Sequence, residues 1–402
     1  MPTQSEPGAP VGEGSIPLSV PEIRGNEWKY IKECLDTNWV SSAGPFVDRF
    51  EREVARYVGA SCAVACSSGT AALHVALLVA GVCADDEVLV SDLTFIAPAN
   101  AVRYCGAWPV FIDAEPDYWQ MDVEKVAEFL VDGCRMEGEE LINKTTRRRV
   151  KAILPVHILG HPVDMDPLMK LARRFGLTVI EDATESLGAK YKGRMVGHLG
   201  DFACFSFNGN KIITTGGGGM MVTDNKAWTE KARYLTTQAK DDPVEYVHNE
   251  IGYNYRLTNI QAAMGCAQME QLDEFVKAKR AIAEKYAKAL GSVPGLRVMR
   301  EAPWAFSTFW LTSVLVDEIG FGMRSRELIA HLATLKIQTR PLWQPLHLNT
   351  PYAGVRNESA VHAERIHRQA LCLPSSVGLR DDDLNRVVGA ILSIRKERIR
   401  QG

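Results

Sequence analysis

The segment SFNGNKIITTGGGG, residues 206–219, places one lysine, Lys211, in a stretch of small and polar residues. A lysine amine condenses with an aldehyde to form a Schiff base when burial or a nearby charge lowers its pKa. The glycines at 216–219 allow the backbone to approach a bound group closely. The segment lacks the Gly-Lys-Ser/Thr ending of a P-loop. Lys211 is therefore a candidate for covalent cofactor chemistry.

Three further groups complement an amine of this kind. Ser68, Gly69 and Thr70 open a helical pattern, where free amides and hydroxyls form an anion site, although Ser and Thr are also common as plain helix caps. Asp182 ends the run TVIED and either caps a loop or holds a positive charge such as a protonated pyridine nitrogen. Phe95 is either a core residue or a stacking partner for a flat ring. Together these groups describe a pyridoxal phosphate site.

Short apolar runs that alternate with amphipathic ones must position these residues. The strands that we expect are Cys62–Cys66, Val88–Ser91, Trp108–Ile112, Lys151–Pro155, Leu177–Ile180, Phe202–Phe207 and Met220–Thr223. The helices expected between them are Thr70–Val79, Val123–Leu130, Met165–Phe175 and Trp228–Leu235. Such a pattern predicts a mostly parallel α/β sheet covered on both faces, with ligands beyond the carboxyl ends of its strands.

The organisation along the chain predicts two folded domains after a disordered tail at residues 1–15. The large domain covers 16–265 and a smaller α+β domain covers 266–402. The pattern is helical throughout from Leu257 to about Leu290, which would link the two domains. The second domain should contain a strand at Thr312–Val316 and helices at Arg324–Leu335 and about Asp381–Arg398, besides a Pro-rich stretch.

Composition narrows the classes of partner. A net charge of −3 over 402 residues gives no electrostatic case for nucleic acid or a membrane surface, and no segment is apolar enough to span a bilayer. The start of the chain lacks the pattern of a secretory signal. Nine scattered cysteines without a CxxC motif favour a reduced, cytoplasmic protein. His157 and His161 do not share a helix face, so we expect no metal there.

Several longer motifs resemble the pyridoxal phosphate-dependent sugar aminotransferases of the DegT/DnrJ/EryC1/StrS family. These are WVSSAGPFVDRFE, SSGTAAL, DLTFIAPANAV, VFIDAEPD, VIEDATESLGA, GDFACFSFNGNKIITTGGGGM, GYNYRLTNIQAAMG and IQTRPLWQPLH, and the similarity runs from about Ile16 to the C-terminus. The resemblance implies fold type I, with a mixed seven-stranded sheet between helices in the large domain and a smaller C-terminal domain.

The resemblance also implies roles for individual residues. Lys211 would bind the cofactor as a Schiff base, and Asp182 would pair with the pyridine nitrogen. Phe95 would stack on the ring. Asn254 in GYNYR matches a residue that reaches the phosphate of the neighbouring subunit, which implies a homodimer with shared active sites.

The phosphate contacts implied by the resemblance come from Gly69, Thr70 and Ser206. Two departures from the family pattern bear on the site. Glu185 stands where the family often has Gln near the phenolic oxygen of the cofactor, and two acidic groups close together would repel, so that Glu185 is either protonated or turned away. Asn208 takes the place of a frequent His, with unchanged spacing to the lysine.

The implied reaction is transamination from L-glutamate to a nucleotide-linked keto sugar. The motifs are similar to the subgroup of nonulosonic acid and surface-polysaccharide pathways, which implies amination at C4 of a 4-keto-6-deoxyhexose, often with a 2-acetamido group. Arg256, Arg340 and His347 are candidate substrate-binding residues. For each, the alternative is a surface or interdomain ion pair, which is favoured for Arg340 and evenly balanced for His347.

Three alternatives stay open at this stage. Amination at C3 uses the same cofactor machinery. A sugar dehydratase relative typically has His where Lys211 stands, so the lysine argues against that activity. A non-enzymatic regulatory or binding protein would have a broken site, whereas Lys211, Asp182 and the phosphate hydroxyls are all present.

Overall fold

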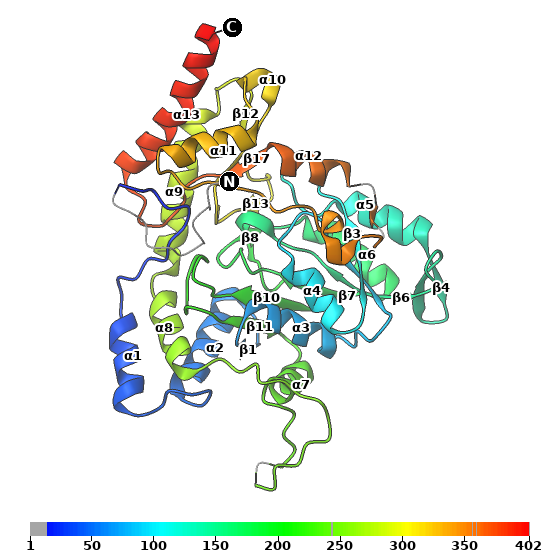
Figure 1. The fold of residues 1–402 in the computed structure, drawn as a ribbon. Coiled ribbons are helices and arrows are strands. Elements are labelled where there is room, and N and C mark those ends of the chain that lie inside the picture. Colours follow the sequence, from blue (N-terminus) through cyan, green and yellow to red (C-terminus); the bar gives the residue numbers. More distant parts are fainter. Residues whose placement is uncertain (1–13, 243, 356, 359, 402) are drawn as a thin grey trace.

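The computed structural model describes residues 14–242, 244–355, 357–358 and 360–401. The predicted disordered tail at 1–15 therefore lies outside the described residues, apart from its last two positions. The described chain forms a large body around a central sheet and a smaller body that carries the C-terminal helix (Figure 1).

The central sheet contains all seven predicted strands. Their order is β1 (Cys62–Cys66), β11 (Gly219–Thr223), β10 (Phe202–Ser206), β7 (Thr178–Asp182), β6 (Arg149–Leu154), β2 (Glu87–Ser91) and β3 (Trp108–Ile112). Strand β11 runs antiparallel to β1 and β10, and the other neighbours among the seven are parallel, so the mixed sheet is confirmed. The sheet is also longer than predicted: β16 (Asn357–Glu358) pairs with β3, and the hairpin β4 (Cys134–Glu137) and β5 (Glu140–Asn143) pairs with β6.

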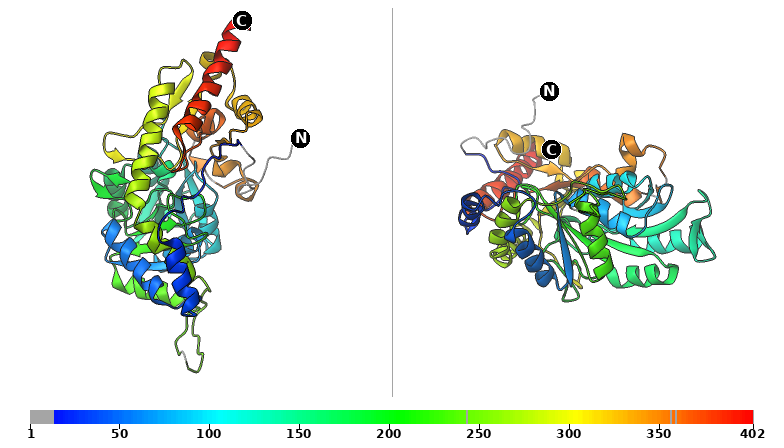
Figure 2. Two further views of the ribbon diagram at one scale, coloured as in Figure 1. Left: turned by 90° about the vertical axis from the view of Figure 1, so that its left-hand side faces the viewer. Right: turned by 90° about the horizontal axis from the view of Figure 1, so that it is seen from below.

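Helices cover both faces of the sheet (Figure 2). One face carries α1 (Glu27–Asp36), α2 (Pro45–Val58), α5 (Val123–Glu128), α6 (Met165–Phe175) and α8 (Asn259–Met269). The other carries α3 (Gly69–Val79), α4 (Ala97–Tyr104) and α7 (Lys226–Thr236). Because side chains alternate along a strand, Ala63 and Ala65 of β1 face the first core while Val64 and Cys66 face the second. Burial on both sides explains why these strands are continuous apolar runs.

Strand direction gathers the predicted site at one edge of the sheet. Since β1 and β10 are both antiparallel to β11, they run in the same direction as β7, β6, β2 and β3. Ser68, Phe95 and Asp182 therefore follow or end strands at a common edge, and Lys211 follows β10 there. The antiparallel strand β11 begins at this edge, so the glycines that precede it lie beside the same residues.

The smaller body has its own sheet and core. Strands β12 (Leu296–Val298), β14 (Ser313–Val316), β17 (Ala370–Cys372) and β15 (Arg340–Pro341) form the sheet, and α9 (Leu272–Leu290), α11 (Ser325–Thr334) and α13 (Asp381–Gln401) pack on it. The remaining elements are α10 (Glu318–Phe321), α12 (Val361–Gln369), a small sheet of β13 (Ala305–Phe306), β8 (Lys190–Tyr191) and β9 (Arg194–Met195), and single turns at Phe129–Gly133, Ile158–Gly160, Leu346–Leu348 and Thr350–Tyr352.

The chain crosses between the two bodies more than once. Ile16 pairs with Ile337 and belongs to the core of the smaller body, whereas β16 extends the large sheet. The predicted continuous helix from Leu257 to Leu290 is wrong: helices α8 and α9 are separated at Glu270 and Gln271, and residue 265 lies inside α8. The domain limits at 16–265 and 266–402 stay a prediction.

The two histidines of PVHILGHP are buried and occupied by protein partners. His157 Nε2 lies 3.0 Å from Glu181 Oε2, and His161 Nε2 accepts the Ala302 amide at 2.9 Å. Among the described residues there is no group of three or more His, Cys, Asp and Glu side chains arranged to hold a metal ion. No helix of this part of the chain is long and apolar enough to cross a bilayer. The nine cysteines all lie in the described part of the chain, and none forms a disulfide bond there.

The packing of α8 on α2 depends on a glycine. A Cβ added at Gly265 would lie 2.6 to 2.9 Å from three ring atoms of the buried Phe50. We expect Gly265→Ala to lower the free energy of unfolding, because overpacking costs about 1–3 kcal/mol whereas alanine gains only about 1 kcal/mol over glycine in a helix. Urea unfolding followed by circular dichroism measures the change.

Gly389 in α13 is the matched control, because an added Cβ there meets nothing within 4 Å. Gly389→Ala should raise the free energy of unfolding by up to about 1 kcal/mol. Equal stabilisation by both substitutions would contradict the packing argument.

Candidate active site

A cavity of about 330 Å³ lies at the edge of the sheet where β1, β2, β7 and β10 end. It brings together eight predicted residues from four separate parts of the chain: Ser68, Gly69, Thr70, Phe95, Asp182, Glu185, Ser206 and Lys211. Trp310 and Trp343, from the C-terminal part of the chain, close its other side. The cavity therefore combines strand ends of the large sheet with two aromatic side chains that pack against the core on its α3 face.

Lys211 lies in a turn that follows β10, and its amide donates to Asn208 O at 3.0 Å. Its side chain is only 14% exposed. The amine Nζ lies 3.5 Å from Glu185 Oε1 and 4.3 Å from the centre of the Trp310 ring. The turn therefore directs the amine into the cavity, between a carboxyl group and an indole face that both favour positive charge.

Asp182 ends β7 with its side chain almost fully buried. Its Oδ1 accepts the Thr184 amide at 3.1 Å. Burial raises the pKa of Asp182, while the bonds from Thr184 and the charge of Lys211 lower it. A buried carboxyl group on the cavity wall is stabilised as an anion by a cationic N–H placed against it.

Glu185 is turned toward the lysine rather than away from it. Its Oε2 accepts the Leu159 amide at 2.8 Å, and its Oε1 forms the contact with Lys211. Burial raises the pKa of Glu185, and the nearby Asp182 adds to this, whereas Lys211 and the Leu159 amide oppose it. The side chain therefore faces the amine in the cavity, and the choice between the two alternatives for Glu185 beside the cofactor stays a prediction.

The first turn of α3 forms an anion cradle. The Ser68 hydroxyl accepts the Ala71 amide at 3.0 Å, so the residue does cap the helix, as the plainer interpretation requires. The amides of Gly69 and Thr70 belong to the first turn, which has no intrahelical acceptors for them. A Cβ at Gly69 would lie 2.9 Å from that of Ser206, which shows how closely the serine approaches the helix start.

Three aromatic side chains border the cavity. Phe95 is 56% exposed, so it is not a core residue, and it lines the cavity. Trp310 and Trp343 were missed by the sequence analysis. Trp343 lies between Arg340 and His347 in the motif IQTRPLWQPLH, so an aromatic residue in a Pro-rich segment was the available signal.

The predicted substrate residues do not line the cavity. Arg256 forms an ion pair with Glu51 at 2.5 Å and is 10% exposed, as the structural alternative requires. His347 Nδ1 lies 2.6 Å from Asp92 Oδ2, and this bond raises the pKa of the imidazole despite its burial. Arg340 is half-buried in β15. Their substrate-binding roles stay predictions, with no contact to the cavity in this chain.

Asn254 also lies outside the cavity of its own chain. The residue is exposed and its backbone forms a bridge with Thr237. It lies in the long connection between α7 and α8, which projects from the body of the molecule (Figure 1). This placement leaves its side chain free to contact another molecule.

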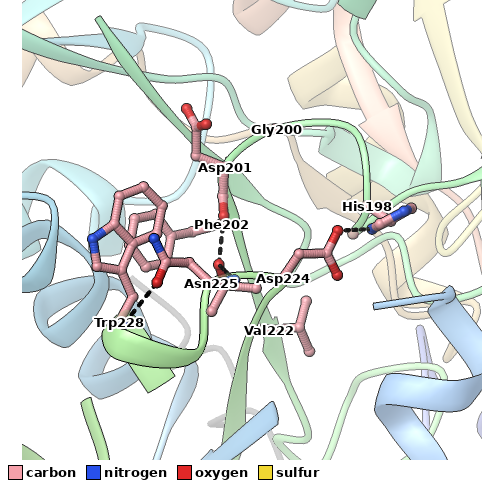
Figure 3. Close-up of a pocket in the computed structure, with 10 residues that line it drawn as sticks. His198, Gly200, Asp201, Phe202, Val222, Asp224, Asn225 and Trp228 are labelled. Carbon is pink, nitrogen blue, oxygen red and sulfur yellow. Dashed lines mark hydrogen bonds and ion pairs between the residues drawn. The ribbon is translucent and has the colours of Figure 1, made fainter. Parts of the chain in front are cut away.

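A second hollow, of about 430 Å³, lies at the opposite edge of the sheet, where β10 begins and β11 ends (Figure 3). His198 Nδ1 lies 3.2 Å from Asp224 Oδ2, and the Trp228 ring stacks on Phe202 at 4.5 Å. None of the predicted site residues borders it. Of the two cavities, only the first contains a lysine amine together with paired carboxyl groups.

The chain belongs to the DegT/DnrJ/EryC1/StrS aminotransferase family, whose pattern matches residues 21–392. It is 42% identical to a GDP-perosamine synthase of Caulobacter vibrioides, over 94% of this chain and 97% of the relative. It is 41% identical to EpsN of Bacillus subtilis, whose name assigns it to the pyridoxal phosphate-dependent aminotransferases, over 94% and 95% of the two chains.

Solved structures agree with the sequence relatives. The crystal structure of DesI in the presence of its TDP-sugar product superposes with a TM-score of 0.86 at 28% identity, over 98% of this chain and 96% of that one. The predicted family, the fold type I architecture and the enzyme class are therefore confirmed.

The residues present fit pyridoxal phosphate. The anion cradle at α3 suits a phosphate, and the buried Asp182 carboxyl on the same cavity suits a protonated ring nitrogen. A Cβ added at Gly219 would collide with the backbone of Ser68, so the glycine run lets β11 pack directly against the cradle. Lys211 supplies the amine within the same cavity.

The raised pKa of Glu185 predicts a pH-dependent contribution to stability. Between the ordinary and the raised pKa the folded protein binds more protons than the unfolded chain, so this residue's contribution to stability falls as the pH rises through that window. Glu185→Gln cannot titrate. We therefore expect the melting temperature of the cofactor-free variant to fall less than that of the cofactor-free wild type as the pH is raised through that window.

Glu284→Gln is the control, because Glu284 is exposed on α9. It should reproduce the pH dependence of the wild-type melting temperature. A wild-type pH dependence in Glu185→Gln would show that Glu185 titrates in the same way in the folded and unfolded states.

Proposed function

We propose that this protein transfers the amino group of L-glutamate to C4 of a nucleotide-linked 4-keto-6-deoxyhexose, with pyridoxal phosphate as cofactor. The observation that carries the proposal is the single cavity in which Lys211, Asp182 and the start of α3 meet, in a chain of a sugar aminotransferase family. The relatives named above support a nucleotide sugar as the acceptor.

The cofactor is pyridoxal phosphate, as the family and the EpsN relative indicate. When bound, it supplies an aldehyde that condenses with amines and a ring that accepts the electron pair left by a broken C–H bond. Lys211 holds it covalently at rest. The Asp182 carboxylate keeps the ring nitrogen protonated, and the amides of Gly69 and Thr70, with Ser206, bind the phosphate.

Lys211 moves the protons of the reaction. Once its amine is free, Nζ takes the proton from the α-carbon of glutamate as a general base. In the second half of the reaction it returns a proton to the sugar carbon that receives the amino group. Glu185 Oε1 lies 3.5 Å from this amine, close enough to orient it within the cavity.

The substrate class follows from the relatives. Three of them, at 37 to 42% identity, are named GDP-perosamine synthases, so a GDP-linked 4-keto-6-deoxyhexose is the first acceptor to examine. A 2-acetamido sugar linked to UDP is the other acceptor that the sequence motifs favour. The pathway is surface polysaccharide or related sugar synthesis in the cytoplasm.

A homodimer with shared active sites is part of the proposal. The connection that carries Asn254 exposes Val244, Tyr246 and Ile251, which are 78%, 69% and 84% exposed. Apolar side chains gathered on a projecting segment favour burial against a partner. A second copy would cover them and bring Asn254 to the phosphate of its neighbour.

The first test concerns the lysine. The purified protein with pyridoxal phosphate should show a visible absorbance band that is lost on addition of L-glutamate and restored by the correct keto sugar, with the product identified by mass. NMR of the product distinguishes C4 from C3 amination. Lys211→Ala should lose at least about 10³-fold in kcat, because it lacks the proton-transferring amine. Substantial turnover by this variant would disprove the assignment.

The shared site predicts complementation between two defective chains. In a hybrid of Lys211→Ala and Asn254→Ala, one site combines both defects and the other has neither. With random C2 pairing, an equal mixture refolded together at limiting pyridoxal phosphate should recover about a quarter of wild-type activity per chain. Lys211→Ala mixed with Ser206→Ala is the control and should recover none, because both residues line the cavity of one chain. A site within one subunit would give no recovery in either mixture.

A further inference from the structure

One lysine of the interdomain helix α9 is buried without an acidic partner. Lys279 is 2% exposed, and no carboxylate lies within ion-pair distance of it among the described residues. Its Nζ donates to the Trp310 carbonyl at 2.9 Å and to the Ser375 carbonyl at 2.6 Å. Burying a lysine in this way is costly, so the contacts that it makes require an explanation.

The two acceptors match a neutral amine. A neutral amine has two N–H donors for the two carbonyls, whereas an ammonium group has a third donor for which the described residues offer no acceptor. Burial lowers the pKa of Lys279 to about 7, which agrees with that geometry. At neutral pH and above, the amine can therefore stay buried with its donors satisfied.

The Trp310 carbonyl is one end of a short connection to Lys211. The indole Nε1 of the same residue donates to Asn210 O at 2.8 Å, in the turn that carries the lysine. The indole face lies 4.3 Å from Lys211 Nζ. Trp310 therefore contacts the amine of Lys211 and the backbone immediately before it, while Lys279 holds the backbone of Trp310 from the opposite side.

We propose that Lys279 is a positioning residue for Lys211 and acts through Trp310. By fixing the carbonyl of Trp310, Lys279 fixes the indole ring, and the ring in turn sets both the path of the 208–211 turn and the charge preference of the Lys211 amine. The inference rests on the proposed role of Lys211 in binding pyridoxal phosphate.

The next residue of the helix supports this view. Arg280 donates to the Ser307 carbonyl at 2.6 Å and forms an ion pair with Glu301 at 2.7 Å. Helix α9 thus holds the 307–310 segment at both ends, by Arg280 at one end and Lys279 at the other. Only the end held by Lys279 includes a residue that lines the cavity, namely Trp310.

The test compares Lys279→Met with Lys277→Met in the full-length enzyme loaded with pyridoxal phosphate. Methionine has a similar length without donors, and Lys277 is an exposed lysine of the same helix. In Lys279→Met the pH midpoint of the cofactor's visible absorbance band should move to lower pH, because a displaced indole no longer stabilises positive charge on the nitrogen. The kcat should fall about tenfold or more, with KM for the keto sugar within about twofold. Lys277→Met should change neither.

A double-mutant cycle separates positioning from general destabilisation. Trp310→Phe removes the donor to Asn210 and should also shift the midpoint. If Lys279 acts through Trp310, the shift in Lys279→Met/Trp310→Phe should equal that of Trp310→Phe alone. Additive shifts, or a wild-type midpoint in folded Lys279→Met, would overturn the proposal.

Two further results would also decide between the interpretations. If Lys279→Met does not fold, Trp310→Phe alone decides, and a wild-type midpoint in that variant would overturn the proposal. An absent band in the wild-type protein would instead contradict the proposed function itself.

Discussion

The cost of burying an amine beside two carboxyl groups dominates the design of the cavity. Lys211, Asp182 and Glu185 all lie on one small cavity, and each would be expensive as an isolated charge. Burial raises the pKa of both carboxyl groups, and the charge of Lys211 only partly opposes that rise. In the proposed function, a cofactor with a cationic ring nitrogen would give Asp182 a counter-charge. The protein and the cofactor would therefore complete each other electrostatically.

The direction of β11 explains the glycine run that follows Lys211. Strand β11 is antiparallel to both neighbours, so it starts at the edge of the sheet where β1 and β10 end. Its first residues consequently pass beside the start of α3, where a Cβ at Gly219 would meet the backbone of Ser68. The glycines thus permit a close approach of two backbones beside the start of α3.

The local sequence pattern was sufficient to predict the part of the site that lies at the ends of the strands. Lys211, Asp182, the 68–70 turn and Phe95 each follow a short apolar run, and the carboxyl ends of such strands meet at one edge. Nothing local indicated Trp310, and the local signal for Trp343 was only an aromatic residue in a Pro-rich segment, because the positions of both depend on long-range packing against the core on the α3 face of the sheet. For the same reason a single sequence could not show that Arg256 is engaged by Glu51, 205 positions away.

The prediction of the fold from local sequence has the same limit. Strands of the central sheet were predictable because burial on both faces makes each of them a continuous apolar run. The break between α8 and α9 was not, since Glu270 and Gln271 are both compatible with a helix and α9 packs on two cores, with Phe275 in that of the large body and Tyr286 in that of the smaller one. The short strand β16 consists of two residues, Asn357 and Glu358, and only its pairing with β3 defines it as a strand.

The segment that carries Trp343 is also held by polar contacts outside the cavity, as Trp310 is. Asp92, at the end of β2, accepts the His347 amide at 3.0 Å and the Leu346 amide at 2.9 Å, besides its bond to the imidazole. His347 thus fixes the Pro-rich segment to the large sheet, which accounts for an ion-paired histidine near the cavity without direct contact. Both tryptophans that line the cavity are therefore connected to hydrogen bonds outside it, so the shape of the cavity depends on residues that do not line it.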